Sequence, residues 1–211
     1  MAERKIGVVN DNMDKCYTYA EHKGRYSRAM KYEFYFEAML IDYALMEDRL
    51  KSFLYHAGVL QSRTSFKIDC SKPNKKVLKQ IYCDYRKKDD VNLPQIKNIS
   101  GKIDVIRAVF EWTSTTTEIP DNNRYLKALK SQCESVDIGG MLDALDQIKD
   151  WCDYRNEIVH ALMNKNIDSL NVELCDKAIE GMQIANKLDT YVRDMKKGNK
   201  VRKSANMHID K

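Results

Sequence analysis

The stretch "MLDALDQIKDWCDYRNEIVHAL", residues 141–162, has the pattern of one long amphipathic helix. Its apolar positions recur at alternating spacings of four and three residues, which is the period of one face of an α-helix. The stripe consists of Met141, Leu145, Ile148, Cys152, Arg155, Val159 and Leu162. Arg155 is its one charged member. The stretch therefore predicts a helix that packs against other helices and carries an arginine in the interface.

Apolar residues recur with the same period along most of the chain. Helices are expected at residues 29–57, 73–88, 100–113, 122–136, 141–162 and 168–195. Gly58 is suited to stop the first of them, Ser100 to cap the third, and Asp168 or Ser169 to cap the last. No segment shows the alternation of a strand, and no internal repeat is visible. We therefore predict an all-α bundle of three long helices, the first and the last two, with the shorter helices packed around them.

The length and composition favour a single domain. A chain of 211 residues, 43% of them hydrophobic, is long enough to bury one sizeable core. We expect a helical domain at residues 26–197, preceded by an N-terminal segment at 1–25. From Gly198 onward the chain has no apolar periodicity, so residues 198–211 are expected to form a basic, mobile tail.

The six cysteines, at positions 16, 70, 83, 133, 152 and 175, have no spacing typical of a zinc site or a redox pair. We therefore expect no metal and no cofactor, and unpaired thiols in a reducing compartment. The first residues, "MAERKIGVVNDNMD", lack the apolar core of a signal peptide, and no run of about 18 apolar residues occurs. The expected result is a cytoplasmic protein that does not enter a membrane.

The net charge of +5 is unevenly distributed. Residues 72–88 carry seven basic side chains and one acidic one, and residues 193–211 carry seven basic and two acidic ones. The remainder of the chain is therefore acidic. Two basic segments on an acidic body are typical of a protein that binds a polyanion, although a solvated helix face and a mobile tail have the same composition.

Three polar residues, Arg155, Asn156 and His160, stand out on the predicted helix at its C-terminal end. With 3.6 residues per turn, Asn156 and His160 lie one turn apart on the flank of the apolar stripe, and Arg155 lies within it. An arginine there can pair with an acid of a neighbouring helix, such as Glu47 or Asp48, or extend its charge to solvent along its apolar stem. Taken alone, His160 is more often explained as a structural histidine. Together the three form a donor-rich patch at the edge of a helix interface.

The segment "RNEIVH", residues 155–160, resembles the signature of the HEPN superfamily of helical domains. That signature is an arginine, four to six intervening residues and a histidine, often with a polar residue directly after the arginine. Arg49 with His56 and Arg202 with His208 have the same spacing, but neither arginine is followed by an asparagine. The first pair ends where its helix is expected to stop, and the second lies in the expected tail. The resemblance therefore rests on residues 155–160 within the predicted helical domain.

Many members of this superfamily are endoribonucleases that use no metal ion, and the resemblance implies the same activity here. Such cleavage deprotonates the ribose 2′-hydroxyl, stabilises charge on the phosphate oxygens and protonates the 5′-oxygen, which leaves a 2′,3′-cyclic phosphate. His160 is suited to transfer protons near neutral pH, and Arg155 is suited to bind phosphate oxygens. Asn156 is expected to orient the histidine or to bind phosphate. Glu47 is the candidate for a supporting acid.

The resemblance also implies a homodimer in which two copies of the motif share one cleft. RNA is the expected partner, guided to the cleft by Lys72, Lys75, Lys76 and Lys79. A toxin or antiviral defence role, with a neutralising antitoxin or a regulatory partner, fits such an enzyme. Several toxin members carry a tyrosine where this chain has Leu162, so control by modification of that tyrosine is not expected. Two alternatives stay open: a non-catalytic helical module that binds RNA or nucleotides, and a protein-interaction bundle.

Overall fold

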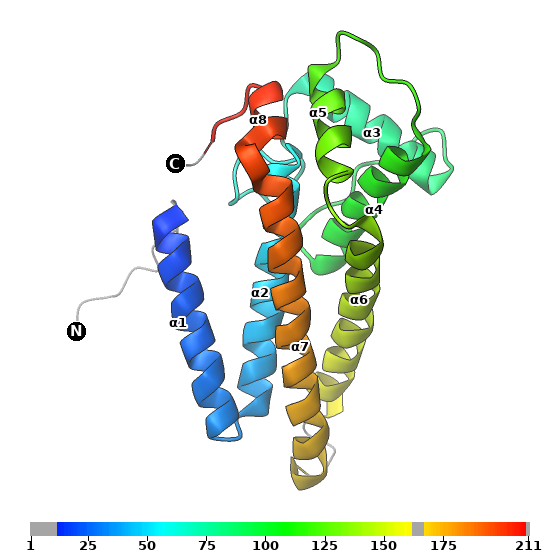
Figure 1. Ribbon diagram of the computed structural model, residues 1–211. Helices are drawn as coiled ribbons and strands as arrows, with labels where there is room; N and C mark the ends of the chain where they lie inside the picture. Colours follow the sequence, from blue (N-terminus) through cyan, green and yellow to red (C-terminus); the bar gives the residue numbers. More distant parts are fainter. Residues whose placement is uncertain (1–11, 162–166, 210–211) are drawn as a thin grey trace, which may run out of the picture.

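The computed structural model describes residues 12–161 and 167–209, and every regular element within these ranges is a helix. The helices, shown in Figure 1, are α1 (Asn12–Lys31), α2 (Tyr35–His56), α3 (Lys72–Arg86), α4 (Ile99–Thr115), α5 (Arg124–Cys133), α6 (Ile138–Ala161), α7 (Ile167–Lys196) and, after a 3-10 turn at Lys197–Asn199, α8 (Lys200–Ser204). The predicted all-α bundle is confirmed. Within the described residues, no helix combines the length and the apolar composition needed to cross a membrane.

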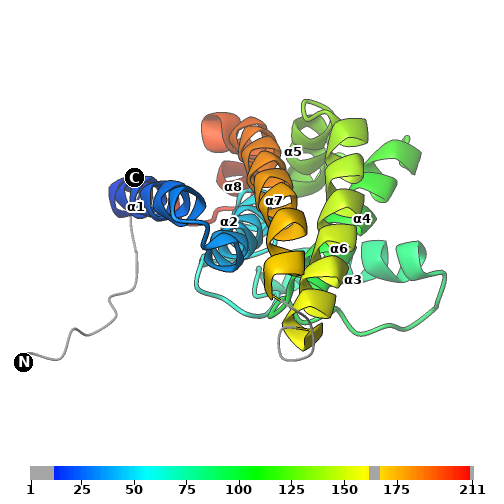
Figure 2. The same cartoon turned by 90° about the horizontal axis from the view of Figure 1, so that it is seen from below.

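The long helices α2 and α7 pack closely against each other at the centre of the bundle. A Cβ atom added at Gly181 of α7 would lie 2.8 Å from the carboxylate of Asp42 on α2, so only glycine permits this close approach. Figure 2 shows that α6 and α4 lie on one side of the pair and α1 on the other. The three long helices that the sequence predicts correspond to α2, α6 and α7.

The expectation of one continuous helix at 29–57 is wrong, because the chain reverses between α1 and α2. α1 ends at Lys31, Glu33 has a left-handed backbone conformation with a φ of 62°, and α2 begins at Tyr35. The apolar period continues through this turn, but Tyr32 and Phe34 are 60% and 58% exposed. No glycine or proline marks the turn, so the hydrophobic period alone could not locate it. α1 also crosses the expected segment boundary at residue 25.

Local capping residues set the other helix ends. Gly58 follows the end of α2 as predicted, with a φ of 70° that glycine adopts without strain. α4 is capped by Asn98 and not by Ser100, because the Asn98 Oδ1 accepts a hydrogen bond from the backbone N–H of the third helical residue at 3.0 Å. α7 already begins at Ile167, ahead of its two expected caps.

α6 buries a face that is rotated from the predicted stripe. The buried residues are Met141, Ala144, Leu145, Ile148, Trp151 and Ile158. Of the predicted stripe, Cys152 and Arg155 are half-buried, Val159 is 40% exposed, and Leu162 lies outside the described residues. The indole N–H of Trp151 donates a hydrogen bond of 2.8 Å to a backbone carbonyl oxygen of α7, which fixes this orientation. Arg155 therefore lies at the edge of the helix interface rather than within it.

The residues expected to form a tail pack on the end of the bundle, so the expectation of an unpacked tail is wrong for α8. Val201 and Arg202 are buried. The Arg202 guanidinium donates hydrogen bonds of 2.8 to 3.1 Å to the carbonyl oxygens of Tyr55, Leu60 and Gln61. These carbonyls lie at or just beyond the C-terminal end of α2, where helix carbonyls lack partners within the helix. A hydrophobic period cannot reveal this anchor, because its largest buried side chain is charged.

Candidate functional site

A groove with a volume of 560 Å³ runs along the second half of α6, between α6 and the helices α2, α3 and α4. Its lining includes Tyr43, Tyr85, Ile103, Arg107, Arg155 and Asn156. Arg107 is already engaged, because its Nη2 pairs with an Asp146 carboxylate oxygen at 2.6 Å. The groove therefore brings Arg155 and Asn156 together with aromatic side chains from two other helices.

Arg155 contacts its neighbours, but no carboxylate of the described residues pairs with it. Its guanidinium carbon lies 4.6 Å from the ring centroid of Tyr43, and its Nη1 donates a hydrogen bond of 3.0 Å to the Oδ1 of Asn156. The Nε of Arg155 is buried and has no hydrogen-bond partner among the described residues. A half-buried guanidinium with an unused donor and no paired carboxylate is suited to bind an anion.

The two acids that the sequence offers as partners for Arg155 pair elsewhere. Glu47 accepts a hydrogen bond of 2.8 Å from the ammonium of Lys102, which is 1% exposed. Asp48 pairs with Lys15 and Arg49 on the opposite side of α2. The explanation of Arg155 as one half of a buried ion pair with either acid is therefore wrong for the described structure.

Glu47 nevertheless lies near the groove. Burial raises the pKa of the Tyr43 hydroxyl, and the Glu47 carboxylate raises it further, whereas Arg155 lowers it. Glu47 thus contributes to the electrostatic environment of the ring on which Arg155 lies. Its hydrogen bond to Lys102 is a structural contact, so its use as a supporting acid stays a prediction.

His160 lies one turn beyond Asn156 on α6, and its side chain is exposed. Residues four apart lie on the same face of a helix. His160 does not line the groove, and no hydrogen bond or ion pair joins it to another described residue. The structure therefore brings Arg155 and Asn156 into contact and leaves the histidine open to solvent beyond the end of the groove.

The basic helix α3 confirms the predicted helix at 73–88, but its lysines are not close to the end of α6. Lys72, Lys75 and Lys76 are exposed. Lys79 pairs with Asp90, with 2.5 Å between its Nζ and a carboxylate oxygen. In Figure 1, α3 lies toward the upper end of the bundle beside α5, whereas α6 ends at the lower end. The structure thus separates these four lysines from His160.

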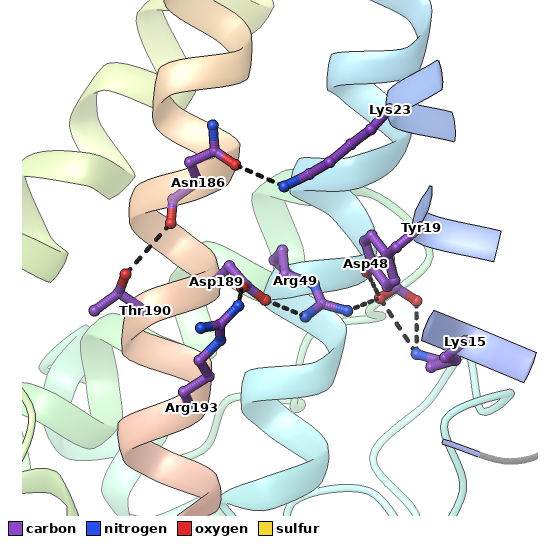
Figure 3. Close-up of polar contacts among 9 residues, drawn as sticks. All are labelled: Lys15, Tyr19, Lys23, Asp48, Arg49, Asn186, Asp189, Thr190 and Arg193. Carbon is purple, nitrogen blue, oxygen red and sulfur yellow. Dashed lines mark hydrogen bonds and ion pairs between the residues drawn. The ribbon is translucent and has the colours of Figure 1, made fainter. Parts of the chain in front are cut away.

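Sequence reasoning missed a charged network between α1, α2 and α7, which Figure 3 shows in detail. Asp48 accepts hydrogen bonds from the Tyr19 hydroxyl, from Lys15 at 2.9 Å and from Arg49 at 3.0 Å. The other arm of the Arg49 guanidinium reaches Asp189 on α7 at 2.6 Å. Burial opposes ionisation of Asp48, but Lys15, Tyr19 and Arg49 together lower its pKa to about 2. The network therefore holds α1 against the central pair.

A cavity with a volume of 430 Å³ lies beside this network, and both Arg49 and His56 line it. These two residues have the same spacing as the signature at 155–160 and lie two turns apart on α2. His56 is only 4% exposed. Burial, together with Arg63, Lys196 and other cations, lowers the pKa of its imidazole to about 2. In the sequence, the shared spacing of Arg49 and His56 is the feature that points to this cavity.

The third pair with the same spacing, Arg202 and His208, is structural. The Nε of Arg202 donates a hydrogen bond of 2.7 Å to the backbone carbonyl oxygen of His208, and the guanidinium caps α2.

In the part of the chain that the structure describes, no three histidine, cysteine or acidic side chains are grouped so that they could hold a metal ion. Comparisons of the chain with protein families, with curated proteins and with solved structures give no match.

Proposed function

We propose that the protein is an endoribonuclease of the HEPN type that needs no metal ion and cuts RNA at the end of α6. The observation that supports the proposal best is the guanidinium of Arg155, which lies on the Tyr43 ring and has no carboxylate partner among the described residues. A charge in this position is costly unless an anion compensates it. An RNA phosphate supplies that anion, and the planar guanidinium can bind two of its oxygens.

The three motif residues have separate roles in the proposed reaction. Arg155 binds the non-bridging phosphate oxygens, and Asn156 holds the guanidinium through the hydrogen bond of 3.0 Å to its Oδ1. His160 accepts the proton of the ribose 2′-hydroxyl. The 2′-oxygen attacks phosphorus, the bond from phosphorus to the 5′-oxygen breaks, and that oxygen takes up a proton from a protonated His160 of a second chain. The products are a 2′,3′-cyclic phosphate and a 5′-hydroxyl.

A homodimer is part of the proposal, because the reaction moves two protons and each chain offers one histidine at this place. Val159, adjacent to His160 and one turn beyond Arg155, is 40% exposed. An apolar side chain beside a solvent-exposed histidine favours contact with a second copy of the same surface. A two-fold contact there would place two histidines and two arginines at one cleft.

Cleavage of a labelled RNA in the presence of EDTA tests the proposal. We expect cleavage to persist and the products to carry 2′,3′-cyclic phosphate ends. His160→Ala should lower the rate by about 100-fold or more with unchanged helical content, since the side chain is exposed. His208→Ala, a change of another exposed histidine, is the matched control and should retain most activity. Loss of activity with EDTA, or 3′-hydroxyl ends, would contradict the proposal.

The same uncompensated arginine also fits a helical module that binds RNA or nucleotides without cutting them. Binding that depends on Arg155 but produces no cleavage would favour that alternative. A toxin or defence role belongs to the proposed ribonuclease, because an active enzyme should slow the growth of a host that expresses it. A strain expressing His160→Ala should then grow normally, and growth inhibition by that variant would contradict the toxin role.

A further inference from the structure

Among the described residues, cationic side chains outnumber acidic ones at the cavity between α1, α2 and α7. Six cationic side chains line it: Lys15, Lys23, Arg49, Arg63, Arg193 and Lys196. Two carboxylates, those of Asp48 and Asp189, pair with Lys15, Arg49 and Arg193. Within the described ranges, no carboxylate pairs with Lys23 or Lys196. Cations around one cavity repel each other, and an anion bound inside the cavity offsets that repulsion.

Buried polar atoms at the same cavity lack partners. The Nδ1 of His56 and the Nε of Arg49 are buried and have no hydrogen-bond partner among the described residues. Leaving a buried donor without a partner costs about 1–3 kcal/mol. Both residues line the cavity. An acceptor oxygen inside it could therefore satisfy the Arg49 Nε–H, and also His56 in the tautomer that carries its proton on Nδ1.

The shape of the cavity limits the kind of anion. Three helices surround it, and its volume of 430 Å³ falls in the range typical of small-molecule sites, about 300–1,000 Å³. Apolar side chains, those of Leu45, Ala185 and Val192, form part of the wall. A ligand that fits combines more than one negative charge with a small body. A folded RNA or a protein surface could touch the mouth but not fill the interior.

We propose that this cavity binds a small ligand that carries a diphosphate group. The phosphoryl oxygens face the cations of α2 and α7 and reach Lys23 on α1. They accept hydrogen bonds from the Arg49 Nε–H and from His56 in the tautomer that carries its proton on Nδ1. The remainder of the ligand contacts the apolar wall. Bound in this way, the ligand joins α1 to the two central helices.

The site is separate from the proposed cleavage site. Arg49 and Asp48 lie on the side of α2 that faces α1 (Figure 3). Tyr43 of α2 instead contacts Arg155 of α6. Ligand binding is therefore expected whether or not the chain cuts RNA. Failure of either proposal leaves the other unaffected.

Inorganic pyrophosphate is the probe, with sodium chloride at the same ionic strength as reference. A ligand at 100 times its Kd should raise the unfolding temperature of a chain of this size by roughly 5 to 10 °C. The double variant Arg193→Ala/Lys196→Ala removes two cavity cations. The double variant Lys187→Ala/Lys197→Ala removes two exposed lysines nearby that do not line the cavity, and so changes the net charge equally.

We expect pyrophosphate to stabilise the wild type and the control double variant and to have less than a fifth of that effect on the cavity double variant. Calorimetric titration should give one site per chain, with orthophosphate weaker than pyrophosphate. His56→Gln, which changes one donor and no charge, should weaken binding by about 10-fold. Equal stabilisation of both double variants, or no effect beyond that of chloride, would overturn the proposal. So would a single-stranded RNA that binds these residues more tightly than pyrophosphate.

Discussion

The Arg155 guanidinium lies 4.6 Å from the ring centroid of Tyr43, so a charge of α6 that pairs with no described carboxylate lies over an aromatic ring of α2. A cation over an aromatic face is stabilised by about 0.5–2 kcal/mol. The ring thereby holds the guanidinium at the groove and leaves its charge in place. A carboxylate in the same position would neutralise that charge. The two residues come from helices that are far apart in the sequence and adjacent in the fold.

Arg155→Lys should abolish most RNA cleavage, because an ammonium cannot reproduce the planar fork that binds two phosphate oxygens. Tyr43→Leu keeps the charge and removes the ring, so we expect a smaller loss, about 3- to 30-fold in kcat/KM. Single-turnover cleavage of a labelled RNA measures both. Tyr17→Leu, at a tyrosine that is 70% exposed on α1, is the matched control. A Tyr43→Leu protein with unchanged kcat/KM would show that the ring has no part in positioning Arg155.

The lysines of α3 should affect RNA affinity rather than the cleavage step. Each phosphate neutralised on a single strand contributes about 0.7 to the slope of log K against log salt. Replacing Lys72, Lys75 and Lys76 with alanine should therefore lower that slope by up to about 2, measured by fluorescence anisotropy at several salt concentrations. Lys79→Ala alone should change it little, because Lys79 is paired with Asp90. An unchanged slope in the triple variant would identify the lysines as a solvated face.

Asp42 should make the stability of the protein depend on pH. Its side chain is fully buried, both carboxylate oxygens lack hydrogen-bond partners among the described residues, and burial raises its pKa from 3.8 to about 8. The unfolded chain loses this proton above pH 4, whereas the folded chain keeps it until pH 8. The free energy of unfolding should therefore fall as pH rises from about 4 to 8, by up to about 5 kcal/mol.

Asp42→Asn removes the titration and keeps the shape, so the variant should be more stable than the wild type at pH 8 and similar to it at pH 4. Urea unfolding at the two pH values gives the comparison. Glu37→Gln, an exposed acid on the same helix, serves as control and should follow the wild-type profile. If the free energy of unfolding depends on pH in the same way in the Asp42→Asn variant and the wild type, Asp42 does not cause the pH dependence.

The hydrophobic period predicted α3, α4 and α5 and most of α7, because each of these helices buries one regular face. It failed at a turn that no residue type marks and at a helix that polar contacts anchor. The reversal at Glu33 carries no glycine or proline, and α8 is anchored by a buried arginine. On α6 the period selected Val159, although the helix turns Trp151 and Ile158 inward. Spacing alone cannot decide between two adjacent faces of one helix.

The candidate site was predictable only where its residues are neighbours in sequence. Arg155 and Asn156 are adjacent, so their contact follows from the helix itself. Tyr43 could not be assigned to them from the sequence, because that contact depends on how α2 packs against α6. The cavity lined by Arg49 and His56 depends in the same way on how α2 packs against α1 and α7. Arg49 of α2 and Asp189 of α7, which pair there, lie 140 positions apart in the sequence.

Arg202 should be among the residues most important for stability. Its guanidinium is fully buried and donates hydrogen bonds to carbonyl oxygens at the end of α2. Arg202→Met keeps much of the volume but leaves these carbonyls without their donors, so we expect a loss of about 3 kcal/mol in the free energy of unfolding. Lys203→Ala changes the exposed neighbour and should stay within about 0.5 kcal/mol of the wild type. Similar urea midpoints for the two variants would contradict this role.

The proposed homodimer can be tested at Val159, which is 40% exposed beside His160. Val159→Lys places a cation where two copies are expected to meet, so the variant should sediment as a monomer and lose most cleavage while its helical content stays near that of the wild type. A lysine is used because it does not repel RNA, and the loss can then be attributed to the broken contact. Ile179→Lys, at a residue of α7 that is 43% exposed, makes the same change elsewhere and should remain dimeric and active. A wild-type protein that is monomeric at micromolar concentration and still cleaves RNA at full rate would show that each motif works alone, with His160 of one chain accepting and returning the proton.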